Sequence, residues 1–120
     1  MVNRLGFVTF IAIAVACTDQ GPQSVGGAWV AATSVSTHTI ALTQSDTLVT
    51  GTGDYANHVM RTNATIVITG SYRPPTVVLH FIYLGADSSY YRASYVHGAQ
   101  MSGIETFTGG STDTLVFSRQ

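Results

Sequence analysis

The chain has no lysine, a single cysteine and little charge of either sign. Its 120 residues include five arginines and six acids, and charged residues make up 9% of the total. The arginines are scattered, so no basic stripe exists that could release counterions from a phosphate backbone, which argues against nucleic-acid binding. One cysteine excludes a disulfide within the chain. A single domain of this length can bury an apolar core without one.

What the chain does contain is typical of β structure. Hydrophobic residues make up 45% of it, and Thr, Ser and Gly are abundant. Low charge alone could indicate disorder, but disordered chains lack the β-branched and aromatic residues found here from Trp29 to Phe117. The composition predicts a folded, neutral, β-rich protein.

The first residues have the layout of a secretory signal. Arg4 is followed by an apolar run from Leu5 to Ala16, then by Cys17 and a polar segment. The run is well short of the roughly 20 apolar residues that a membrane-spanning helix needs. We expect residues 1–16 to be a signal peptide, residues 17–26 a flexible, lipid-bearing tether, and residues 27–120 a β-barrel domain.

Two kinds of processing fit this signal, both with the cut just before Cys17. "AVA" at Ala14 to Ala16 suits ordinary signal peptidase, which would leave Cys17 as a free thiol. "AVAC" resembles the lipobox of bacterial lipoproteins, with Ala14 where leucine is usual, and we favour it because the lone cysteine stands at this offset. The resemblance implies acyl chains such as palmitate on Cys17, which anchor the protein to a membrane. Since Thr18, not aspartate, follows, it also implies the outer membrane, facing the periplasm or the cell surface.

From Gly27 onward short β-rich runs recur about every ten residues, with turn signals between them and no helical stripe. This spacing predicts an all-β fold, a small eight-stranded antiparallel up-and-down barrel, with a β-sandwich as the alternative. The eight predicted strands are Ala28–Thr33, His38–Thr43, Thr47–Gly53, Ala64–Tyr72, Thr76–Leu84, Tyr90–His97, Met101–Thr108 and Thr112–Arg119.

The predicted turns have a chemical basis. Proline gives no ladder donor, so Arg73–Pro75 should form a corner, and Gly109–Gly110 suits a hairpin turn. Residues 55–63 should be the longest connection. An aspartate beside Gly, Ser or Thr can bond nearby backbone amides. On this ground we expect four acids in turns: Asp46, Asp54, Asp87 and Asp113.

Alternation along the strands assigns their faces. It points one set of apolar side chains into the interior, namely Ile40, Leu42, Leu115 and Phe117. The run from Thr76 to Leu84 is apolar on both faces apart from His80, so we expect its outer side to be covered by the tether or the long loop, or to meet a partner.

The two ends of the domain carry a family resemblance. "GAW" at Gly27 to Trp29 opens the first strand, and Arg119 ends the last. This resembles the terminal signature of the calycin superfamily, which includes lipocalins and avidins. The resemblance implies that Trp29 packs under Arg119 and that these residues, with Gly27, close one end of the barrel and are structural.

The sequence gives little support for catalysis or cofactor binding. The four histidines fit no compact metal-ligand spacing, and no nucleophile motif or phosphate-binding loop is present. Glu105 is the only acid expected within a strand, and it has no evident partner for acid–base work. We expect no enzyme activity, no cofactor and no metal.

A group of tyrosines is the best candidate for binding. Tyr83, Tyr91 and Tyr95 should cluster on neighbouring strands and could line a ligand site, or form an aromatic ladder that only stabilises the sheet. We expect a lipid-anchored, non-catalytic binding module, for a small apolar ligand if the lumen is open. The alternatives are a module that binds or inhibits another protein, such as a hydrolase, and a structural envelope lipoprotein.

Overall fold

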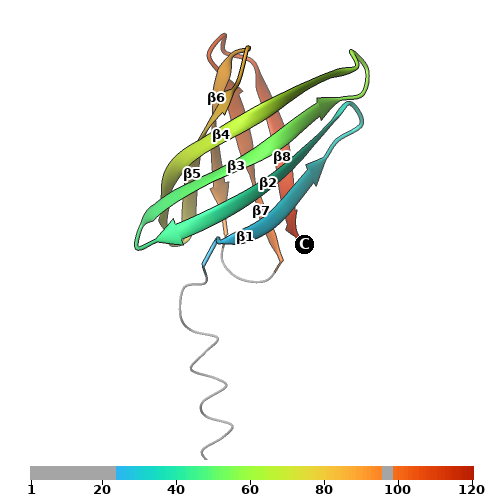
Figure 1. Cartoon of the computed structure of the whole chain (residues 1–120). Coiled ribbons are helices and arrows are strands. Elements are labelled where there is room, and N and C mark those ends of the chain that lie inside the picture. The colour runs from blue at the N-terminus through green and yellow to red at the C-terminus, as the bar shows by residue number, and fades with distance from the viewer. Residues whose placement is uncertain (1–23, 96–98) are drawn as a thin grey trace, which may run out of the picture.

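The computed structural model describes residues 24–95 and 99–120, which form a closed eight-stranded antiparallel barrel (Figure 1). The predicted all-β up-and-down barrel is therefore confirmed. None of the described residues forms a helix long and apolar enough to cross a membrane. The strands are β1 (Gly27–Ala32), β2 (Ser36–Ser45), β3 (Leu48–Asn57), β4 (Thr62–Arg73), β5 (Thr76–Tyr83), β6 (Ser88–Ser94), β7 (Gln100–Phe107) and β8 (Thr112–Arg119).

Each strand pairs with the next in sequence, and β1 closes the sheet against β8. The closing pairs are Trp29 with Arg119 and Val30 with Ser118. Closure gives every strand a neighbour on both sides, and the seam between β1 and β8 is short, with two register pairs.

Four of the predicted turns lie where the sequence placed them, and one of these is the connection between β5 and β6, which contains Asp87. Pro74 and Pro75 join β4 to β5, and the peptide bond between them is cis. Gly109–Gly110 lies between β7 and β8, where Gly110 has a φ of 97°. Asp46 lies between β2 and β3 with a φ of 61°. Local chemistry was sufficient for these turns because proline, glycine and aspartate favour such backbone conformations.

The prediction of a long connection over residues 55–63 was wrong. β3 continues to Asn57 and β4 begins at Thr62, so the turn has only residues 58–61. Asp54 and Asp113 were also predicted in turns and lie within β3 and β8 instead. Their backbone amides belong to the sheet ladders, so pairing with neighbouring strands outweighs the local turn preference of aspartate.

The middle of the barrel is filled by its own side chains. The predicted interior residues are buried, with exposed fractions of 5% or less for Ile40, Leu42, Leu115 and Phe117. A side chain that lined a water-sized cavity would keep some accessible area, yet several large ones keep none. These are Trp29, Ile66, Leu79, Phe81, Tyr91, Met101 and Phe117.

The outer wall is mostly short and polar, with some exposed apolar side chains, among them the register partners Val67 and Ile82. On β5, Ile82 is 37% exposed, so none of the described residues fully covers this side chain, while residues 17–23 of the predicted tether lie outside the described residues. His80 stacks on Tyr90 of β6, with ring centres 4.4 Å apart.

The two ends of the barrel differ. β1 begins and β8 ends at one of them, which we call the tryptophan end because it contains Trp29 (Figure 1). The opposite end carries the turns 33–35, 58–61, 84–87 and 108–111, and we call it the glutamate end because Glu105 lies near it on β7.

Candidate functional site

The tryptophan end is closed by Arg119. Its guanidinium lies 4.3 Å from the centre of the Trp29 ring, and its two terminal nitrogens donate to the carbonyl oxygens of Gly26 at 2.6 Å and Ser24 at 2.9 Å. Gly27 has a φ of 122°, and a Cβ there would lie 2.9 Å from Arg119 Nη1. Glycine is required here both by the backbone conformation and by the space the guanidinium occupies.

Tyr95 completes this closure. Its hydroxyl accepts a hydrogen bond from Arg119 Nη2 at 2.9 Å, and its ring meets Trp29 edge-on with centres 5.7 Å apart. The Trp29 indole donates to the Val25 carbonyl at 2.9 Å. Each of these polar groups has a protein partner, so the arrangement is suited to holding the barrel shut.

The glutamate end contains a buried polar cluster of four side chains: His38, Tyr83, Ser89 and Glu105. The Tyr83 hydroxyl and the Ser89 hydroxyl both donate to Glu105 Oε2, the latter at 2.5 Å. His38 Nε2 lies 3.0 Å from the Tyr83 oxygen. All four residues are at most 5% exposed, so they form a group of polar side chains within the core.

The hydrogen bonds fix the tautomer of His38. Because the Tyr83 proton is committed to Glu105, the Tyr83 oxygen can only accept from His38. His38 must therefore carry its proton on Nε2, and its Nδ1 is a bare acceptor. Among the described residues, neither His38 Nδ1 nor Glu105 Oε1 has a hydrogen-bond partner. The cluster uses all its donors and leaves two acceptors unpaired.

Burial shifts the pKa values of the cluster. Loss of solvation lowers the pKa of His38 to about 4, so its ring is neutral at pH 7. The 3.7 Å contact between His38 Nε2 and Glu105 Oε1 is therefore not an ion pair, and it is too long for a hydrogen bond. Burial also raises the pKa of Glu105, against the lowering effect of the Ser89 and Tyr83 hydroxyls, and raises the pKa of Tyr83.

Aromatic rings surround His38. Tyr55 on β3 is nearest, with ring centres 4.9 Å apart, and Tyr55 in turn meets Tyr83 edge-on at 5.4 Å. Phe81 and Phe117, both fully buried, have ring centres 6.2 and 6.1 Å from that of His38. Tyr55 is the partly exposed member of the set, so it separates the cluster from solvent.

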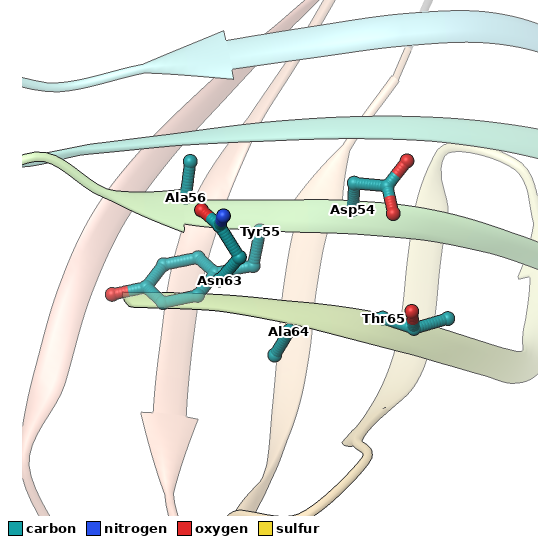
Figure 2. A pocket seen from close by; sticks show the side chains of 6 residues that line it. All are labelled: Asp54, Tyr55, Ala56, Asn63, Ala64 and Thr65. Atoms are coloured by element: carbon teal, nitrogen blue, oxygen red, sulfur yellow. The ribbon is translucent and has the colours of Figure 1, made fainter. Parts of the chain in front are cut away.

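A surface pocket of about 310 Å³ adjoins Tyr55 on β3 and β4. Figure 2 shows Tyr55 and Ala64 on one side of this pair of strands and the other lining side chains on the opposite side. Those lining residues are Asp54, Ala56, Asn63 and Thr65. Asp54 is its only charged lining residue, and Tyr55 is the lining residue that also contacts two members of the buried cluster, His38 and Tyr83.

The three tyrosines predicted to line a ligand site do not meet at one place. Tyr83 belongs to the glutamate-end cluster and Tyr95 to the closure at the opposite end. Tyr91 lies between them, fully buried, and its hydroxyl donates to the carbonyl oxygens of Met101 and Leu115. Only Tyr83 is placed with unpaired polar groups nearby. Cys17, the predicted lipidation site, lies outside the described residues.

Sequence reasoning missed His38, Ser89 and Glu105 as a group. They come from β2, β6 and β7, far apart in the chain, and only barrel closure brings them together. Alternation carried a partial signal, because His38 shares a face with buried Ile40, and Glu105 shares one with buried Met101.

The described histidines do not form a metal site. Among the described residues, no group of three or more His, Cys, Asp or Glu side chains is close enough to hold an ion. His58 Nε2 bonds the Thr37 hydroxyl at 2.8 Å, and His80 stacks on Tyr90. His97 lies outside the described residues.

Comparison with known proteins gives no further guidance to the site. No family model, no curated protein and no solved structure matches this chain. The geometry of the two barrel ends is therefore the basis on which a function is proposed.

Proposed function

We propose that this protein is a lipid-anchored, non-catalytic binding module of the bacterial envelope that takes a small ligand at the glutamate end of its barrel. One observation carries the proposal: His38 Nδ1 and Glu105 Oε1 are buried without hydrogen-bond partners among the described residues. An unpaired buried acceptor costs about 1–3 kcal/mol, and a bound ligand that donates to it recovers that free energy.

Because the interior is filled, the end of the barrel is a better candidate for ligand binding than the lumen. Large side chains in the middle have no accessible area, so a ligand there would have to displace the core. At the glutamate end the partly exposed rings of Tyr55 and Phe107 lie against the cluster, on His38 and Tyr83. A ligand at this end needs side chains at the rim to move, not a repacked core.

The proposed anchor suits this arrangement. The tether would join the domain at the tryptophan end, where residue 24 is held by Arg119. A lipid on Cys17, as the lipobox resemblance implies, would place that end next to the membrane and turn the glutamate end away from it. We include the calycin resemblance in this proposal. The resemblance rests on three residues of the tryptophan end, namely Gly27, Trp29 and Arg119.

A second candidate function is binding to another protein. Val59 and Met60, in the turn between β3 and β4, are the most exposed large hydrophobic side chains of the described residues, at 69% and 71%. The turn projects beyond the barrel wall at the glutamate end (Figure 1). Exposed apolar side chains on a projecting turn are suited to insertion into a partner's groove, as an inhibitor loop does.

Native mass spectrometry of the full chain purified from its own host tests the proposal. A bound small molecule, lost when Tyr83→Phe alters the cluster but kept in the outer-wall control Tyr90→Phe, is the expected result. A bound protein that is lost in a Val59→Ser, Met60→Ser double variant would favour the second candidate. A bare protein would contradict both and favour a structural envelope protein.

A separate experiment tests the anchor. The Cys17→Ala variant should lose acyl labelling and move to a soluble fraction, whereas the neighbouring Thr18→Ala control should keep both label and membrane association. Unchanged membrane association of the Cys17→Ala variant would contradict lipidation at this residue.

A further inference from the structure

The unpaired atoms of the glutamate-end cluster specify the hydrogen-bonding character of a ligand. Nδ1 of neutral His38 and Oε1 of Glu105 are both acceptors, and the hydroxyls of Tyr83 and Ser89 are already used as donors within the cluster. A complementary group must therefore bring donors, and a group that only accepts hydrogen bonds would find none offered.

No cationic side chain among the described residues pairs with the Glu105 carboxyl. The chain has no lysine, and Arg119 is held at the tryptophan end by Trp29 and Tyr95. Asp113 is the register partner of Glu105 across β7 and β8, and its charge adds to the factors that raise the pKa of Glu105. The carboxyl thus faces a second acid in place of a positive partner, and an added cation would favour its ionised form.

The charged side chains of the described barrel are distributed unevenly between its two ends, and this distribution also favours a cation at the glutamate end. The glutamate end carries four of the five described acids and one described arginine, Arg61. Those acids are Asp54, Asp87, Glu105 and Asp113. The remaining described arginines, Arg73, Arg92 and Arg119, lie toward the tryptophan end. Such a field attracts cations to the glutamate end and repels anions from it.

The aromatic surroundings add to this preference. The ring centres of Tyr55, Phe81 and Tyr83 lie within 6.3 Å of that of His38 or of one another. Aromatic faces carry negative partial charge and stabilise a cation held over them, most strongly where water is excluded.

We infer that the glutamate end binds a small organic cation with at least two N–H donors, such as a protonated primary amine, which donates to Glu105 Oε1 and His38 Nδ1 beneath Tyr55. The inference rests on the proposed function and names the chemical class of its ligand. Entry requires Tyr55 to move, and its hydroxyl is held by the Asn57 side chain at 3.1 Å, two residues away on the same strand.

Isothermal titration of the full chain at pH 7 with three matched probes tests the inference. Benzylammonium is the cation, benzyl alcohol its neutral counterpart and benzoate its anionic one. Benzylammonium should bind at least tenfold more tightly than the other two, and Glu105→Gln should remove most of this preference. The control Asp46→Asn, which removes an acid from the opposite end, should change affinity by less than twofold.

Asp113→Asn provides a second variant, because an exposed side chain can be changed without risk to folding. It should weaken benzylammonium binding two- to fivefold at low salt. Equal or tighter binding of benzyl alcohol or benzoate overturns the inference and leaves the proposed binding function standing. Absence of benzylammonium binding at millimolar concentration, or an affinity that Glu105→Gln in folded protein and Asp113→Asn leave unchanged, also overturns it.

Discussion

The guanidinium of Arg119 lies 4.3 Å from the centre of the Trp29 ring, and these two residues are also register partners where β8 meets β1. The same pair thus joins the first strand to the last and covers the end of the barrel. Because Arg119 also donates to the carbonyl oxygens of Gly26 and Ser24, the closure includes the segment that leads into β1.

Arg119→Ala should lower the free energy of unfolding by about 2 kcal/mol, since it removes a cation–π contact and charged hydrogen bonds to the backbone. Arg119→Lys should recover only part of this free energy, because an ammonium group is not planar. It cannot stack flat on the indole ring and at the same time donate to the two carbonyl oxygens. Arg73→Ala, at the same end but exposed, is the matched control in urea denaturation. Equal losses of unfolding free energy for Arg119→Ala and Arg73→Ala would show that the contacts of Arg119 do not stabilise the closed end of the barrel.

Tyr83→Phe should lower the free energy of unfolding by about 1–3 kcal/mol, because it removes a hydroxyl that links two buried groups. His38 Nε2 would lose its acceptor, and Glu105 would keep only the Ser89 donor. Tyr90→Phe changes an outer-wall residue that is 55% exposed and should cost less than about 0.5 kcal/mol. Similar losses for the two variants would show that the Tyr83 hydroxyl has no structural role.

Glu105→Gln should become steadily more stable relative to wild type as the pH rises above 4.5, the ordinary pKa of a glutamate. In the wild type the folded state holds the Glu105 proton more tightly than the unfolded state, so its stability falls as the pH rises toward the elevated folded pKa. The variant has no such group. It keeps the opposite contribution of His38, whose lowered pKa makes stability rise between pH 4 and 6.5, by at most about 1.4 kcal/mol per pH unit.

Denaturant titrations of both proteins from pH 4 to 8 check this. Ser89→Ala keeps the carboxyl but removes a donor that lowers its pKa, so the fall in stability should move to higher pH. A constant difference between Glu105→Gln and wild type over this range would mean that the pKa of Glu105 is not raised by folding.

Gly53→Ala should lower the free energy of unfolding by about 1–3 kcal/mol, the usual cost of forcing extra atoms into a packed site. A Cβ at Gly53 would lie 2.5 Å from the Thr39 carbonyl oxygen and 2.7 Å from Ile40 Cγ2, so β2 and β3 would have to separate. Gly109→Ala is the control, since a Cβ there meets nothing within 4 Å. Equal thermal stability of the two variants would show that β2 and β3 can separate freely.

The predicted strands differ from the observed ones chiefly at their ends. The pattern over residues 47–53 and 64–72 identified β3 and β4, but pairing extends both strands toward the turn at 58–61. Propensity indicated a turn at Asp54, whereas its register partners Thr39 and Thr65 hold it in the sheet. Such pairing depends on residues elsewhere in the chain, which the pattern of a single segment does not include.

The sequence by itself determined the class of this fold. Alternating apolar residues, regular turn signals and the absence of helical periodicity are local properties, and they are sufficient to predict eight antiparallel strands and the inward faces of β2 and β8. They also identify Trp29 and Arg119 as a pair through a family resemblance.

Only the tertiary structure decided where the polar chemistry lies. His38, Tyr83, Ser89 and Glu105 come from four different strands, and their contacts depend on register and closure around the whole barrel. The structure also decided that the middle of the barrel is packed, because side-chain volume fills a lumen only once the strands are closed around it. Hydrogen-bond geometry acts over about 3 Å, and no pattern along a single strand encodes a distance between strands.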